Sequence, residues 1–157
     1  MRTLLMASAL VAMPLAILVT MASTQTHAAS SPQAYARCAA CHLPTGAGVP
    51  GSYPSLRVDA RALAMNPEGR RYLVQAVVKG LSGPITVEGK TYRGTMPMQA
   101  GMDDATVAGV LTYVTGSLTA GGGAKPKPFT AEEVKAAKAA GASKSAAAVA
   151  KSRPTLR

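Results

Sequence analysis

The sequence Cys38-Ala39-Ala40-Cys41-His42 is the strongest constraint on what this chain can fold into. Cys38 and Cys41 are the two cysteines of the chain, and a spacing of three positions is close to one helical turn. Two thiols so placed can each add to one vinyl group of a haem, and the next residue then presents an imidazole to the iron. We therefore expect Cys38 and Cys41 to attach one haem c covalently, with His42 as a ligand of the iron.

Residues 1–28 have the three-part layout of a secretory signal peptide. Arg2 supplies the basic start, an apolar stretch follows, and the small residues Thr26 and Ala28 predict cleavage after Ala28. An uncleaved membrane anchor is the alternative, because the apolar stretch is nearly long enough to span a bilayer. Pro14 within the stretch favours cleavage. Cleavage would export the protein and remove His27, leaving His42 as the only histidine of the mature chain.

Two other uses of a Cys-x-x-Cys pair fit the sequence less well. A thioredoxin-like redox pair needs a strand before it, and no strand is predicted ahead of Cys38. A structural zinc site uses four ligands, whereas the mature chain offers only Cys38, Cys41 and His42. Haem attachment is the interpretation that uses all of these side chains.

Large aromatic side chains are scarce in this sequence. The chain has no tryptophan and one phenylalanine, Phe129, which lies in the C-terminal region. A domain of this size has difficulty filling its core from such a composition. A buried haem would supply the missing apolar volume.

The chain divides into four regions by composition. They are a signal peptide at 1–28, a monohaem domain at 29–119, a Gly/Pro linker at 120–129, and a short helix with a basic disordered tail at 130–157. Thr130 and Glu133 have the spacing of a capping box that opens a helix at 130–140. From Gly141 onward the Ala, Lys and Ser residues offer little to bury, which predicts disorder.

The haem domain is predicted to be helical with long loops. The pattern indicates helices at 32–42, 68–80 and 103–118, a loop at 43–66, and a small hairpin at 85–92 that turns at Gly89. Asp103 is the expected N-cap of the last helix.

Positive charge is concentrated in the C-terminal region. Residues 29–119 carry eight basic and five acidic side chains, and residues 120–157 carry eight basic and two acidic ones. Nucleic acid is not the expected partner, because the domain has no basic stripe interleaved with aromatic residues and the protein is exported. An acidic protein or a membrane surface is the expected contact of the tail, and a solvated extension without function is the alternative.

With one mature histidine, the second axial ligand of the iron should be a methionine sulfur. The mature candidates are Met65, Met96, Met98 and Met102. We interpret Met65 and Met102 as packing residues. Met96 lies in a loop that Gly94 allows to turn and Pro97 stiffens, which favours Met96 and leaves Met98 as the alternative.

Residues 35–118 resemble a class I cytochrome c, and most closely the small bacterial cytochromes that serve as subunits or partners of periplasmic dehydrogenases. The matching segments are the Cys-x-x-Cys-His string, 46–51, 54–56, 78–83, 87–92, Met96-Pro97, Asp103-Asp104 and 110–114. The resemblance implies an all-α fold of three to four short helices and long loops around one haem. The sequence at 115–118 departs from the family pattern, which leaves the docking partner open.

The resemblance also implies roles for individual residues. Pro54 would accept a hydrogen bond from His42, Leu56 would pack on the haem, and Met96 would be the axial sulfur ligand. The last helix would cross the first and bring Gly109 and Tyr113 close to Tyr35.

The expected function is that of a periplasmic electron carrier, not an enzyme, that passes single electrons from a dehydrogenase to an oxidase or another cytochrome. The alternative is a haem enzyme or gas-binding sensor in which the methionine ligand is displaced. No second histidine and no acid–base pair is predicted near the iron, and helix capping accounts for Asp103 and Asp104.

Overall fold

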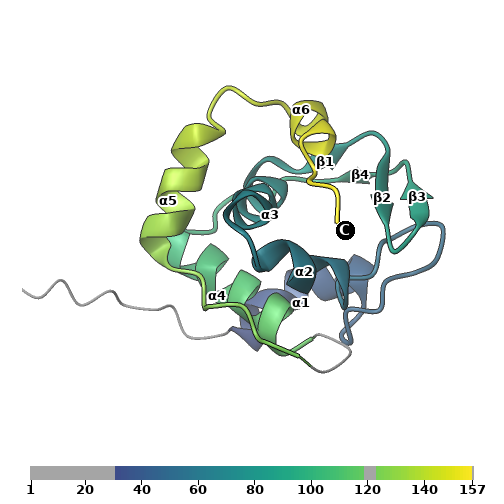
Figure 1. The fold of residues 1–157 in the computed structure, drawn as a ribbon, viewed down its shortest axis with the longest axis horizontal. Coiled ribbons are helices and arrows are strands. Elements are labelled where there is room, and N and C mark those ends of the chain that lie inside the picture. The colour runs from purple at the N-terminus through teal and green to yellow at the C-terminus, as the bar shows by residue number, and fades with distance from the viewer. Residues whose placement is uncertain (1–30, 119–122, 157) are drawn as a thin grey trace, which may run out of the picture.

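Helices dominate the computed structural model, which describes residues 31–118 and 123–156 (Figure 1). The predicted signal peptide therefore lies outside the described residues. The helices are α1 (Pro32–His42), α2 (Asp59–Ala64), α3 (Pro67–Lys79), α4 (Asp104–Gly116), α5 (Ala131–Ala140) and α6 (Ala146–Lys151). The strands are β1 (Leu81–Ser82), β2 (Ile85–Val87), β3 (Lys90–Tyr92) and β4 (Thr95–Met96). No helix within the described ranges is long and apolar enough to span a bilayer.

Side-chain caps fix where most helices begin. The side chain of each cap accepts a hydrogen bond from the backbone N–H three residues further on, as at Asn66 (2.8 Å), Asp103 (2.7 Å) and Thr130 (3.1 Å). Such a bond satisfies one of the N–H groups that a helix start leaves without an internal partner. The predicted first helix and the Asp103 cap are confirmed.

Helix α4 crosses α1 as the resemblance implied. The rings of Tyr35 and Tyr113 lie 5.5 Å apart between centroids, and the N–H of Ser31 donates to the carbonyl of Gly109 over 3.2 Å. Tyr35, Val110 and Val114 are buried at this crossing. The contact sets the position of the last turns of α1, which carry the Cys-x-x-Cys-His sequence.

The region 43–66 contains a helix, which corrects the prediction of a continuous loop. Helix α2 is six residues long and buries Ala60, Leu63 and Ala64 against α3 and α4. Its apolar stripe is short, and glycine and proline surround it in the sequence, so periodicity alone gives little signal. Tertiary packing stabilises a helix of this length.

Two short antiparallel strand pairs flank the interior. The predicted hairpin is confirmed: β2 pairs with β3, with Ile85 opposite Tyr92, and the chain turns at Glu88 and Gly89, both with positive φ. The second pair was not predicted. It joins β1 to β4 and sets Leu81 opposite Met96.

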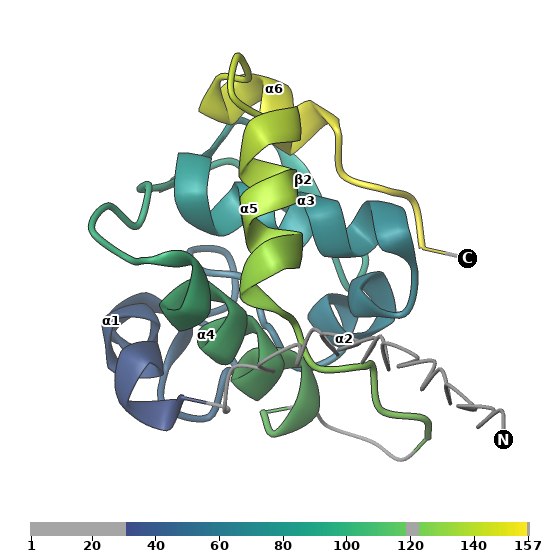
Figure 2. The same cartoon turned by 90° about the vertical axis from the view of Figure 1, so that its left-hand side faces the viewer.

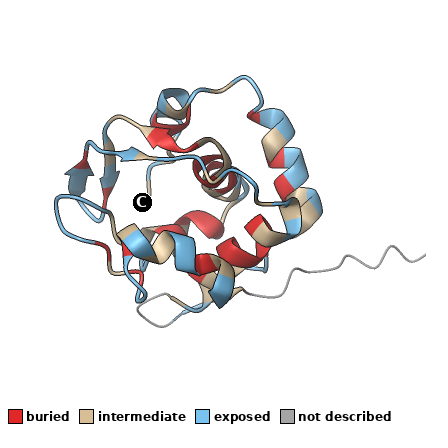
Figure 3. Ribbon diagram, turned by 180° about the vertical axis from the view of Figure 1, so that it is seen from behind, coloured by how far each residue is buried: buried red, intermediate tan, exposed pale blue. Residues whose placement is uncertain are grey.

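The C-terminal segment 123–156 is folded against the rest of the molecule, which corrects the prediction of a disordered tail after Gly141. Helix α5 runs across α3 and α4, and α6 lies against α3 and β1 (Figures 1 and 2). Val134 and Val149 are fully buried, and Figure 3 shows buried positions on α5 and α6 as well as on α3 and α4. The few apolar residues of the segment point to one side, which a count of apolar residues does not detect.

Phe129 corrects the prediction of a free linker at 120–129. Its side chain is fully buried in a cluster with Val74, Val107 and Leu111, and its N–H donates to Thr112 Oγ1 over 2.9 Å. The one phenylalanine of the chain is thus a core residue supplied by the C-terminal segment.

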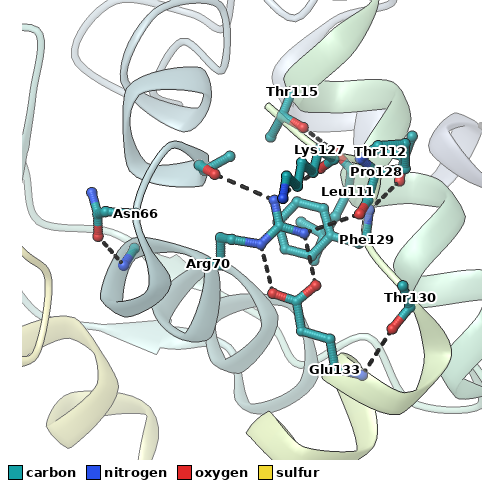
Figure 4. Close-up of polar contacts among 12 residues, drawn as sticks. Asn66, Arg70, Leu111, Thr112, Thr115, Lys127, Pro128, Phe129, Thr130 and Glu133 are labelled. Atoms are coloured by element: carbon teal, nitrogen blue, oxygen red, sulfur yellow. Dashed lines mark hydrogen bonds and ion pairs between the residues drawn. The ribbon is translucent and has the colours of Figure 1, made fainter. Parts of the chain in front are cut away.

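Arg70 on α3 fastens this segment through several contacts (Figure 4). Its guanidinium makes a two-point contact with the Glu133 carboxylate, at 2.6 and 2.7 Å, and donates to the carbonyls of Lys127 and Pro128. Its central carbon lies 3.8 Å from the centroid of the Phe129 ring. The Glu133 carboxylate of the predicted capping box therefore pairs with Arg70, while the Thr130 half of the box is present.

Candidate haem-binding site

Two adjoining cavities occupy the centre of the described structure. The first encloses about 720 Å³, part of it open to solvent, and its walls come from α1, α2, α3, α4 and the strand region. The second lies beside it and shares the side chains of His42, Pro54, Leu81, Ile85 and Met96. Cys38 and Leu56 line the first cavity and Cys41 lines the second. All six predicted site residues therefore meet at this place.

The two cysteines lie on the last turns of α1, ahead of His42, the last residue of the helix. Both are free thiols and both are partly buried. Burial raises the pKa of the Cys38 thiol, although neighbouring Arg37 acts weakly in the opposite direction. The helical spacing sets both sulfur atoms on one side of α1, toward the cavities.

His42 is buried, with 6% of its surface exposed, and its Nδ1 lies 2.8 Å from the carbonyl oxygen of Pro54. Burial lowers the pKa of the imidazole, while the hydrogen bond to Pro54 opposes this shift. A neutral ring that donates from Nδ1 keeps the lone pair of Nε2 available for a metal. The geometry therefore provides the outer support that an iron-bound histidine needs.

Gly48 allows the loop after α1 to close on Pro54. Its φ is +66°, its N–H donates to the carbonyl of His42 over 3.0 Å, and a Cβ added there would lie 2.4 Å from the Tyr53 oxygen and 2.6 Å from the Pro54 oxygen. A side chain at this position would displace the carbonyl that holds the His42 ring.

Met96 lines both cavities, and the β1–β4 pairing fixes its backbone opposite Leu81. Gly80 lies against this segment with a φ of +74°, and a Cβ added to it would be 2.4 Å from the carbonyl oxygen of Met96. The other candidates lie elsewhere: Met98 is 56% exposed, Met65 is 53% exposed, and Met102 packs in the core beside α4. Met96 is the one mature methionine among the described residues that line these cavities.

The cavity walls suit an apolar macrocycle with polar edges. Leu56, whose N–H donates to Gly46 over 2.8 Å, joins Leu63, Val77, Val110 and other aliphatic side chains in the wall. Two thiols, one imidazole and one thioether reach the same space, and these are the groups that attach and ligate haem c. The chemistry of the donor set therefore fits a haem.

Three further residues at the cavity were missed by the sequence reasoning. Tyr72 on α3, Asp59 on α2 and Arg153 after α6 all line the first cavity. Arg153 pairs with Asp59 over 2.6 Å, and both side chains are mostly buried. Asp59 and Arg153 are far apart in the sequence, and the segment with Arg153 was predicted to be disordered, so no sequence signal linked them.

A helical fold that brings a Cys-x-x-Cys-His sequence and a methionine on β4 to two adjoining cavities is the arrangement of a c-type cytochrome. The family model for cytochrome c matches residues 28–117, and the chain belongs to this family as a class I, monohaem member. It binds one covalently attached haem c, and Cys38 and Cys41 fit the attachment motif. The chain is accordingly an electron-transfer haem protein.

Two curated relatives support the assignment. The chain is 42% identical over 105 residues to a cytochrome c-552 of Thermus thermophilus, an alignment that covers 64% of this chain and 78% of the relative. It is also 42% identical over 105 residues to the cytochrome c-552 of a named strain of the same organism, covering 64% of this chain and 69% of that relative.

Proposed function

We propose that this protein is a periplasmic carrier of single electrons whose haem iron is held by His42 on one side and Met96 on the other, with Cys38 and Cys41 forming the thioether links. The observation that carries the proposal is that a Pro54-bonded imidazole and a strand-fixed methionine line the same cavities. When bound, the haem supplies an iron that alternates between its ferrous and ferric forms.

The side chains around the site are suited to keeping both ligands in place during electron transfer. The Pro54 carbonyl fixes the tautomer and orientation of the His42 ring. The β1–β4 pairing and the close approach of Gly80 hold the backbone of Met96. The largely aliphatic walls limit the contact of the centre with water, so fewer dipoles have to reorient when its charge changes.

A catalytic or gas-binding role would need an open iron position and a proton donor or acceptor near it. Asp59 is the one carboxylate among the described residues that line the first cavity, and it is paired with Arg153, so no free carboxylate is available there as an acid or base. We therefore favour the carrier over the haem enzyme or sensor.

Replacing Met96 with alanine tests the ligation directly. We expect M96A to lose the sulfur-to-iron charge-transfer band of the ferric protein, to bind carbon monoxide rapidly when ferrous, and to have a lower reduction potential, because methionine ligation raises the potential. The matched control is M98A, which removes an exposed methionine two positions away. Loss of the band in M98A with retention in M96A would assign the ligand to Met98. Rapid carbon monoxide binding by the unaltered protein would instead favour the sensor.

We further propose export through a signal peptide cleaved after Ala28, with a periplasmic dehydrogenase as donor and an oxidase or another cytochrome as acceptor. Mass spectrometry of the protein from its native host tests the cleavage, and an intact N-terminus would contradict it. Stopped-flow reduction of the ferric cytochrome by a co-purified dehydrogenase tests the donor. A reduction rate that stays the same when the substrate of the dehydrogenase is left out would contradict that assignment.

The basic C-terminal segment is proposed to contact an acidic protein or an anionic membrane surface through Lys125, Lys127, Lys135 and Lys151, which are exposed. Other cations of the segment are engaged within the molecule: Lys138 with Asp104, Lys144 with Gln75, and Arg153 with Asp59. Replacing the four exposed lysines with glutamine should flatten the dependence of electron transfer on ionic strength. An unchanged slope would leave the segment with a purely structural role.

A further inference from the structure

Arg153, which follows α6, reaches back to the central cavity of the cytochrome. Its side chain is 13% exposed and lines the first cavity together with residues of the haem domain. An arginine that only held the C-terminal segment in place at the surface would not need to be buried to this extent. Removing a guanidinium from water is costly unless hydrogen bonds and opposite charge compensate it.

Contacts from two other elements hold the guanidinium in place. Nε donates to the carbonyl of Thr86 on β2 over 2.9 Å, and Nη2 donates to Oδ2 of Asp59 on α2 over 2.6 Å. The same carboxylate oxygen accepts from the N–H of Glu88 over 3.1 Å, so Asp59 is itself fixed. The arrangement orients Arg153 at the cavity, where its partner Asp59 also forms part of the wall.

Tyr72 lies beside Arg153, and its hydroxyl group lacks a hydrogen-bond acceptor. The Arg153 carbon is 5.6 Å from the centroid of the Tyr72 ring, and the proton of the buried Tyr72 hydroxyl has no acceptor in the described part of the chain. Burial raises the pKa of this hydroxyl, while the charge of Arg153 and the donation of its guanidinium toward the phenolic oxygen lower it by less. Because arginine only donates, it can never accept the phenolic proton. The corner therefore offers a cation and a hydroxyl donor and needs an acceptor.

We propose that Arg153 and Tyr72 form a carboxylate-binding corner that receives one of the two propionate groups of the haem. The inference rests on the proposed haem site. A propionate enclosed by aliphatic walls needs a cation or donors to offset its desolvation, and guanidinium with a hydroxyl is a strong pairing for a carboxylate. The C-terminal segment is then part of the haem site as well as a cover for the fold.

The position of Arg153 gives this corner a measurable effect on the iron. Arg153 is the one arginine or lysine among the described residues that line the first cavity. A fixed positive charge nearby disfavours the ferric form, which has one more positive charge than the ferrous form, and the low-dielectric surroundings strengthen the effect. Arg153 should therefore raise the reduction potential.

The test compares holoprotein variants by redox titration, after absorption spectra have shown an attached, sulfur-ligated haem in each. R153Q should shift the ferric–ferrous equilibrium about three- to tenfold toward the ferric form, and a tenfold shift corresponds to about 59 mV for one electron. R153K keeps the charge but loses the planar fork, so its shift should be smaller in the same direction. R71Q is the matched control: it removes an equal guanidinium charge from an exposed position on α3 that does not line the first cavity, and it should leave the potential unchanged.

Two more variants keep the proposal testable if R153Q loosens the C-terminal segment. Y72F removes only the hydroxyl and should shift the equilibrium toward the ferric form, because the propionate loses a donor. D59N leaves Arg153 in place and removes a competing negative charge, so it should shift the equilibrium toward the ferrous form.

Equal potentials for R153Q, R71Q and the unaltered protein, with the haem spectrum intact, would overturn the proposal and leave Arg153 with a purely structural role. An unaltered protein without sulfur-ligated haem would contradict the proposed function itself, and the spectrum reveals this before any variant is compared.

Discussion

The orientation of the His42 ring depends on the backbone of Gly48 as much as on its direct partner Pro54. The Nδ1–oxygen distance of 2.8 Å exists because the loop folds back tightly, and that fold uses a residue with φ of +66° and no side chain. A glycine that does not touch the proposed iron position therefore helps to determine how the imidazole faces it.

Replacing Gly48 with alanine is expected to destabilise the protein by about 2–4 kcal/mol, through the positive φ and the overlap with the Tyr53 and Pro54 carbonyls. The control is G51A, since Gly51 has φ of +81° and no atom within 4 Å of an added Cβ. G51A should lose only about 1–2 kcal/mol from the backbone conformation. Denaturant unfolding of both holoproteins measures the difference, and equal losses would show that the contact with Pro54 contributes nothing.

At the scale of elements, the turn from α3 into β1 determines where the methionine loop lies. Gly80 ends α3 and approaches the carbonyl of Met96, which the β1–β4 pairing holds opposite Leu81. The helix end and the proposed ligand are therefore positioned by a single backbone contact.

We expect G80A to disturb the proposed Met96 ligation, because an added Cβ would lie 2.4 Å from the Met96 oxygen and 2.9 Å from the Met98 nitrogen. The ferric charge-transfer band should weaken and carbon monoxide should bind the ferrous protein faster. G83A is the control, with φ of +108° and open space around the added carbon. If both variants keep the band of the unaltered protein, the close approach at Gly80 does not hold the ligand.

The contact between α3 and α5 depends on the fork geometry of Arg70. Lysine cannot reproduce the two-point pairing with Glu133 together with the bonds to the Lys127 and Pro128 carbonyls. R70K should therefore cost about 1–3 kcal/mol of unfolding free energy. R71K, at the exposed neighbouring position of the same helix, should change stability by less than about 0.5 kcal/mol. Thermal unfolding compares the two, and similar midpoints would contradict the role given to Arg70.

The elements with strong local signals were predictable from the sequence. Asp103 and Pro32 mark helix starts, and Gly89 marks the hairpin turn, because capping and turn chemistry act within a few residues. Helix α2 and the β1–β4 pair were not predictable in this way. Their stability comes from contacts made at a distance, such as Leu63 buried in the core and Leu81 set opposite Met96.

At the scale of the whole molecule, the C-terminal segment 123–156 contributes buried side chains to the core and is not a separate tail. The composition that predicted a linker at 120–129 and disorder after Gly141 hid two positions that matter, Phe129 and Val149, which are fully buried. Cys38, Cys41 and His42 were predictable from one short motif and Met96 from its place beside Pro97, whereas Tyr72 and Asp59 of the same domain were missed. Arg153 was not predictable either, because its partner Asp59 lies in a different part of the sequence.

Replacing Phe129 with alanine tests whether the segment and the domain share one core. We expect a loss of about 3–5 kcal/mol, since the ring is fully buried and its removal leaves a cavity between α3 and α4. M65A truncates an exposed apolar side chain and should stay within about 0.5 kcal/mol of the unaltered protein. A single unfolding transition with a lowered midpoint is expected for F129A, and a midpoint equal to that of M65A would show that the segment folds independently.

The place of Arg153 in the chain has a consequence for assembly. Residues 123–156 follow the cysteines, the imidazole and Met96 in the chain, and they supply part of the cavity wall through Arg153. The pocket is therefore complete only when this segment is docked against α3 and α4, so the folding of the C-terminal segment and the formation of the full pocket are coupled.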